Sequence, residues 1–159
     1  MAEKIDLNTL PKGLTKEEFT ALPNFKKIRS FFTWAGVVSI GSGILICSEI
    51  GKTAESVFQA GGSYDDMSRL WAVKLNMLFM IFDIVMGILL LKKKTTKMAY
   101  ILAITELVYI VLVLVLGGTI GIGAIAFLLA LAGAIRIDKK WKQYQEISGG
   151  SNQLNHTGN

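Results

Sequence analysis

The chain has 159 residues, enough for one domain, and Lys and Arg outnumber Asp and Glu to give a formal net charge of +5. Hydrophobic residues make up 52% of it and gather in long runs. Helices formed by these runs would have no polar face, which excludes an ordinary soluble domain. A single cysteine, Cys47, excludes an intrachain disulfide, and no nucleic-acid-binding motif accompanies the positive charge.

Residues 1–28 form a polar N-terminal arm. Thr15 and Glu18 have the spacing of a capping box, which predicts a short amphipathic helix to about Leu22, and Pro23 then suits the first turn of the next helix. The apolar edge of the arm comprises Phe19, Leu22, Phe25 and Ile28. This edge either lies on lipid headgroups or belongs to a solvated arm, and the sequence leaves both interpretations open.

Four apolar runs cover about 30–48, 70–91, 99–116 and 120–135, the last being the shortest. A helix needs ~20 residues to cross a bilayer, with ~17 as the lower range. The sequence therefore predicts an all-α membrane protein, with four transmembrane helices in an up-down bundle over residues 29–142.

Basic residues define the predicted orientation. They gather before the first run (Lys26, Lys27, Arg29), between the second and third (Lys92, Lys93, Lys94, Lys97) and after the fourth (Arg136, Lys139, Lys140, Lys142). The other two links are poor in Lys and Arg. Because basic segments stay on the cytoplasmic side, both termini are predicted to be cytoplasmic.

Two runs carry ridges of small residues. Ala35, Ser39, Gly43 and Cys47 lie four apart on the first run, and Ala126, Ala130 and Ala134 repeat the pattern on the fourth. Residues four apart share a helix face, and small residues let another helix approach closely. Each ridge packs either against the chain's own helices or against another copy or partner.

The links and ends have their own signals. A short helical turn is predicted over 53–59, and Ser63 with Asp66 forms a second capping box that predicts one helix from Tyr64 to Leu91. Aromatic residues suited to anchor the helices at the membrane interface are Trp34, Trp71, Trp141 and Tyr144. Lys74 is expected to extend toward the outer interface. Residues 143–159 are predicted to form a disordered cytoplasmic tail.

Two carboxyls interrupt the middle runs. Asp83 lies nine residues before Lys92, and Glu106 nine residues after Lys97, so each is ~13 Å from the lysine-rich link. Runs joined by a short link are expected to be neighbours, which places both carboxyls at one depth, with Asn76 on the face of Asp83. Two such groups close together in low dielectric cannot both ionise, so at least one is expected to hold a proton.

The sequence contains no catalytic or metal-ligand set, since its one histidine, His156, lies in the tail. We therefore expect no enzyme activity, cofactor or metal. The first hypothesis is a non-enzymatic accessory protein of assembly or immunity type, which binds another membrane protein or a second copy of itself. The alternative is a small proton- or cation-coupled transporter that uses Asp83 and Glu106. The low content of Cys and the high content of Lys and Ile favour a bacterial plasma membrane as the location. The lipid bilayer is an expected partner, and nucleic acid is not.

Overall fold

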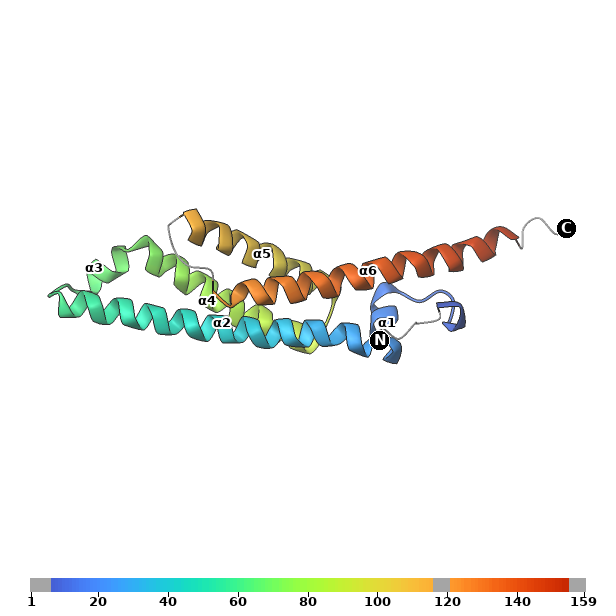
Figure 1. The fold of residues 1–159 in the computed structure, drawn as a ribbon, viewed down its shortest axis with the longest axis horizontal. Helices are drawn as coiled ribbons and strands as arrows, with labels where there is room; N and C mark the ends of the chain where they lie inside the picture. The colour runs from blue at the N-terminus through green and yellow to red at the C-terminus, as the bar shows by residue number, and fades with distance from the viewer. Residues whose placement is uncertain (1–6, 116–120, 155–159) are drawn as a thin grey trace.

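The structure is a computed structural model that describes residues 7–115 and 121–154, and this part of the chain is helical with no strand (Figure 1). Two short 3-10 turns, Leu7–Thr9 and Pro23–Phe25, accompany α1 (Lys16–Ala21), α2 (Lys26–Gln59), α3 (Tyr64–Arg69), α4 (Trp71–Lys93), α5 (Thr96–Val115) and α6 (Gly123–Leu154). The predicted all-α class is confirmed. Within the described ranges, three helices are long and apolar enough to cross a membrane: α2 together with the turn before it, α4 and α5.

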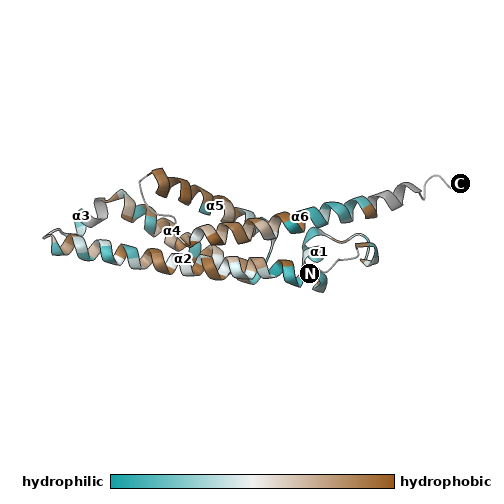
Figure 2. Cartoon of the chain, in the orientation of Figure 1, coloured by the Kyte–Doolittle hydropathy of each residue, from teal (hydrophilic) through white to brown (hydrophobic). Residues whose placement is uncertain are grey.

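The long helices pack around α2 and α6. α2 lies along α4 and also contacts α6, and α6 in turn contacts α5. The contact between α4 and α5 is smaller, although these helices are joined by a short link. Figure 2 shows apolar residues along α5 and through the middle of α2 and α4, with polar residues at their ends and along the later part of α6.

The backbones of α2 and α4 meet at two glycines. A methyl group at Gly36 would lie 2.8 Å from the carbonyl oxygen of Gly87, and one at Gly87 would lie 2.7 Å from that of Gly36. One α-helical turn later, the hydroxyl of Ser39 donates a hydrogen bond of 2.9 Å to the carbonyl oxygen of Asp83. These contacts fix both the spacing and the register of α2 against α4.

Most of the predicted small-residue ridges lie inside the molecule. Ala35, Ser39 and Gly43 on α2 are buried, whereas Cys47 at the end of this ridge is exposed. The ridge of α6, Ala126, Ala130 and Ala134, has no exposed surface. The chain therefore uses these faces for its own packing.

Two helix boundaries differ from the prediction. α2 has 34 residues, about 50 Å at 1.5 Å per residue, and continues through the region expected to be a separate turn. The helix predicted from Tyr64 to Leu91 is divided at Leu70, whose backbone is extended (φ −70°, ψ 113°). Nothing in the structure explains this break.

Both predicted capping boxes are confirmed. The Glu18 carboxylate accepts a hydrogen bond of 2.8 Å from the Thr15 backbone N–H, and Asp66 accepts one of 2.8 Å from the Ser63 N–H. These bonds, with those from the two Ser and Thr hydroxyls, hold the pKa values of Glu18 and Asp66 below their usual range. α1 and α3 therefore begin where the sequence placed them.

The fourth predicted span, about 120–135, is not confirmed by the structure. α6 begins at Gly123 and meets its first charge at Arg136, so its apolar part is only about 20 Å long. It is not among the helices of the described ranges that could span a membrane. α6 continues to Leu154, into the tail that the sequence predicted to be disordered from residue 143. Residues 155–159 lie outside the described part of the chain.

The N-terminal arm packs against α6 after its apolar part. Phe19 of α1 is fully buried, and its ring lies 4.4 Å from the ring of Phe25 and 5.1 Å from that of Trp141 between centroids. The hydroxyl of Tyr144 donates a hydrogen bond of 2.7 Å to the Pro11 carbonyl. It also accepts one of 3.1 Å from the Leu14 N–H.

The sequence had left open how the apolar edge of the arm is covered, and in the structure the arm folds against α6 with Phe19 and Phe25 buried. Of the predicted interface anchors, Trp141 and Tyr144 belong to this aromatic cluster, and Tyr144 is only 3% exposed. Trp34 and Trp71 are largely exposed, and the Lys74 ammonium lies 5.5 Å from the centre of the Trp71 ring.

Replacing Gly87 by alanine should separate α2 from α4. The added methyl would meet the Gly36 carbonyl oxygen and the Ile40 side chain, each at 2.7 Å, and backbone cannot move aside. We therefore expect a loss of about 1–3 kcal/mol in the free energy of unfolding. Thermal unfolding in mild detergent, followed by circular dichroism, measures this. Gly51→Ala is the matched control, because Gly51 is helical, exposed and has open space around it. That change should be neutral or stabilising by up to ~1 kcal/mol, and equal effects of the two variants would contradict the assigned contact.

Tyr144→Phe should loosen the N-terminal arm while the long helices stay folded. The change leaves the Leu14 N–H and the Pro11 carbonyl without their partner, at about 1–3 kcal/mol of local stability. Hydrogen exchange should then become faster over residues 7–22 alone. Tyr64→Phe, at an exposed tyrosine, serves as the control. Unchanged exchange in the arm would argue against the described packing.

Candidate functional site

The structure brings Asp83 and Glu106 together in the middle of the bundle. Asp83 lies on α4 and Glu106 on α5, and each is only 1% exposed. Each carboxyl lies within interaction distance of the other, and the Ser42 hydroxyl of α2 is within hydrogen-bonding reach of Asp83. Three helices thus contribute side chains to one polar group surrounded by apolar residues.

Three of the four oxygen atoms of this pair lack a hydrogen-bond donor. Asp83 Oδ2 and both carboxyl oxygens of Glu106 are buried without a hydrogen-bond partner among the described residues. A carboxylate only accepts hydrogen bonds, so two of them can bond to each other only through a proton that one of them carries. The arrangement therefore calls for a proton shared between the carboxyls, or for a cation beside them.

The beginning of α6 completes the site. Gly123 lies so close to Glu106 that a methyl group at this glycine would overlap the carboxyl. Glu106 lies nine residues before Val115, the end of α5, which places it ~13 Å from that end. α6 therefore starts part of the way along α5 (Figure 1). Its N-terminus carries a partial positive charge, which favours negative charge on Glu106.

A second polar contact joins α4 and α5 two turns away from Asp83. The hydroxyl of Tyr109 donates a hydrogen bond of 3.3 Å to Asn76 Oδ1, and its ring lies 4.5 Å from that of Phe79. Asn76, which the sequence placed in the site, thus accepts a hydrogen bond from Tyr109. Tyr109 and Glu106 line a cavity of about 10 Å³, about the space that one water molecule needs.

Sequence reasoning found the two carboxyls but missed the groups around them. Ser42 had a weak signal, because it adjoins the small-residue ridge of α2. Gly123 had none, since its place beside Glu106 depends on the depth at which α6 begins. Among the described residues no three of His, Cys, Asp and Glu gather in one place, so the site consists of the carboxyl pair.

The chemistry of this arrangement is that of reversible proton binding. A charge at the centre of a bilayer costs at least about 2.5–3.5 kcal/mol, and the described residues place no Lys or Arg against this pair. With one proton, the pair carries a single negative charge next to the positive end of α6. Removal of that proton would leave two adjacent charges that a small cation could neutralise.

Comparisons with known proteins add no name to this site: no protein-family model, curated protein or solved structure matches the chain.

Gly123→Ala should displace the Glu106 carboxyl from the start of α6. We expect a shift of the infrared band of the protonated carboxyl, and a loss of about 1–3 kcal/mol in stability from overpacking. Infrared spectroscopy of the protein in lipid, with Glu106→Gln to assign the band, makes the measurement. Gly121→Ala is the control, since that glycine is exposed and has open space around it. A band that is the same in the native chain and in Gly123→Ala would contradict the proposed geometry.

Proposed function

We propose that this chain is a small, non-enzymatic membrane carrier that binds a proton at Asp83 and Glu106 and exchanges it for a small inorganic cation. The observation that carries the proposal is the pair of fully buried carboxyls with three unpartnered oxygens. Ionisable groups kept at this depth mark ion and proton pathways in membrane proteins. The small cavity beside Glu106 favours a proton or a bare cation over a larger substrate.

The start of α6 supports the same function. Carriers commonly bind their ions where a helix begins or ends near the middle of the membrane, because the ends of half-helices supply charge without side chains. The partial positive charge at Gly123 stabilises the singly protonated pair. Loss of this proton would create a site that attracts a cation. Because one ion leaves when the other binds, the two ions would cross the membrane in opposite directions.

The membrane arrangement belongs to the same proposal. Four crossings in an up-down bundle put α1, the link from α4 to α5 and the later part of α6 on the cytoplasmic side. Support comes from the lysines at this end and their scarcity at the other. The fourth crossing would be formed by the apolar part of α6. We propose that the chain is a multi-pass protein of a bacterial plasma membrane.

A partner-binding, accessory role is the second candidate. One observation favours it: α2 is about 50 Å long, longer than the ~30 Å bilayer core, and projects at the end opposite α1 together with α3 (Figure 1). Phe58 and Tyr64, at this projecting end, are 49% and 68% exposed. They offer a surface for another membrane protein or a second copy. The ridges on α2 and α6 support this role less, because they are buried within the chain.

Transport in liposomes tests the first function directly. Protein in vesicles that contain a pH-sensitive dye and high Na⁺ or K⁺ should take up protons when the vesicles are diluted into buffer without that cation. Asp83→Asn and Glu106→Gln should each reduce this uptake at least about tenfold, because each removes one of the two groups that hold the proton. Glu55→Gln, at an exposed carboxyl, should leave uptake unchanged.

Purification of the same variants separates the two candidates. If the native chain shows no cation-driven uptake while correctly folded, the carrier proposal fails. A partner that co-purifies with the native chain in mild detergent, and is lost when Phe58 and Tyr64 are replaced by serine, would instead establish the accessory role.

A further inference from the structure

A second polar region lies at the lysine-rich end of the bundle. A cavity of about 620 Å³ opens there between α1, the beginning of α2 and the link from α4 to α5. Its volume is within the range of about 300–1,000 Å³ that is usual for sites binding a small molecule. It is separate from the carboxyl pair, because none of its lining residues belongs to that site.

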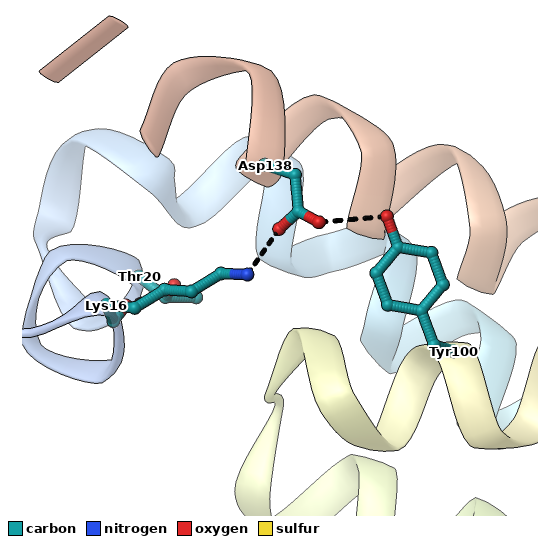
Figure 3. A network of polar contacts seen from close by, with 4 residues as sticks. All are labelled: Lys16, Thr20, Tyr100 and Asp138. Atoms are coloured by element: carbon teal, nitrogen blue, oxygen red, sulfur yellow. Dashed lines mark hydrogen bonds and ion pairs between the residues drawn. The ribbon is translucent and has the colours of Figure 1, made fainter. Parts of the chain in front are cut away.

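A network of polar contacts builds one side of this cavity. Lys16 of α1 forms an ion pair of 2.7 Å with Asp138 of α6, which also accepts a hydrogen bond of 2.9 Å from the Tyr100 hydroxyl of α5. Figure 3 shows these side chains converging from three helices, with Thr20 beside Lys16. Lys16, Thr20 and Tyr100 all line the cavity, so its shape is held by side chains that are already fixed.

The charge of the cavity is strongly positive. Besides Lys16, which Asp138 neutralises, its lining includes Arg29, Lys93, Lys94 and Lys97 against one acid, Glu17. None of these four cations forms an ion pair with a described residue. The first turn of α5, which begins at Thr96 in the same lining, contains no acidic residue to offset the positive helix end.

Lys94 adds a conformational indication. It ends α4 with a left-handed backbone (φ 47°, ψ 39°), a conformation that costs a residue with a side chain roughly 1–2 kcal/mol and glycine almost nothing. A lysine here therefore carries a cost in stability. Lys94 adds an ammonium group to the cavity, and this positive charge accounts for a lysine at a position that favours glycine.

The other wall of the cavity is apolar and faces outward. It includes Ile101 and Ile104 of α5, which are 37% and 62% exposed and lie within the part of α5 that is apolar enough to span a membrane. The cationic side chains at the helix ends therefore lie beside an apolar surface that runs along the membrane-spanning part of α5. A free anion would use only the first of these features, whereas an amphipathic anion would use both.

We propose that this cavity binds the headgroup of an anionic glycerophospholipid, with an acyl chain along Ile101 and Ile104. Basic pockets between membrane helices are suited to such headgroups. The phosphate lies among Arg29, Lys94 and Lys97, near the N-terminus of α5. The arm contributes through Lys16 and Thr20, so the bound lipid also links α1 to the ends of α4 and α5.

Native mass spectrometry with phosphatidylglycerol tests this site. The native chain in neutral detergent, at about 0.15 M ionic strength where charges more than ~8 Å away are screened, should retain phosphatidylglycerol and not phosphatidylcholine. Combining Arg29→Gln, Lys94→Gly and Lys97→Gln should weaken retention on the order of a hundredfold, since each basic group near a lipid surface contributes about fivefold. The matched control removes three cations outside the cavity: Lys92→Gln, Lys139→Gln and Lys142→Gln.

Each outcome decides the proposal. The site is supported if the control variant retains lipid within about twofold of the native level while the cavity variant loses it. Equal loss of lipid retention in both variants would mean that retention depends on general surface charge, and this result would overturn the proposal. Competition by an excess of inorganic phosphate as effective as that by the lipid would make it a free-anion site, and also overturns it.

A single variant covers the case in which the triple variant fails to fold. Lys94→Gly relieves the left-handed backbone and should leave the protein at least as stable. It should still weaken lipid retention by about fivefold, and native retention in this folded variant would count against the assigned cation.

Discussion

The arrangement of this protein depends on the backbone contact between α2 and α4. In a membrane, lipid tails are as apolar as leucine side chains, so helices associate through close packing and hydrogen bonds rather than through the hydrophobic effect. Gly36 and Gly87 permit that close approach, and the bond from Ser39 to the Asp83 carbonyl sets its register. The same register places the Asp83 side chain near Ser42 and turns it toward Glu106.

α5 is positioned mainly by α6, and this has consequences for the carboxyl pair. The contact of α4 with α5 is small, although a short link joins them. Glu106 is therefore held beside Asp83 by a helix that begins next to it, at Gly123, and by the bond between Tyr109 and Asn76.

The lysine-rich end has a different construction. There the N-terminal arm and the extension of α6 build an aromatic cluster around Phe19, and the contact of Lys16 with Asp138 and Tyr100 joins three helices. Four cations line the adjoining cavity and form no ion pair with a described residue: Arg29, Lys93, Lys94 and Lys97. The packing of the arm does not depend on those cations, because it rests on the aromatic cluster and on the ion pair of Lys16 with Asp138.

The sequence alone determined the helical class, the apolar runs of α2, α4 and α5 and the two capping boxes. Each of these follows from composition and spacing within about twenty residues. It also found Asp83 and Glu106 as candidate residues, because a charge in an apolar run stands out whatever surrounds it. These features are local, and the helix period of 3.6 residues converts them directly into faces and depths.

Only the tertiary structure decided where α6 begins and what covers the arm. The apolar run from Ile120 to Ile135 has the same composition whether it crosses the membrane or starts beside Glu106, so the depth of Gly123 cannot be obtained from it. Likewise, Phe19 and Tyr144 are each compatible with a membrane interface until they are found in contact. The arm is covered by a segment more than 100 residues away in the sequence. The start of α6 packs against α5 across the link between these helices. No local sequence pattern encodes either contact.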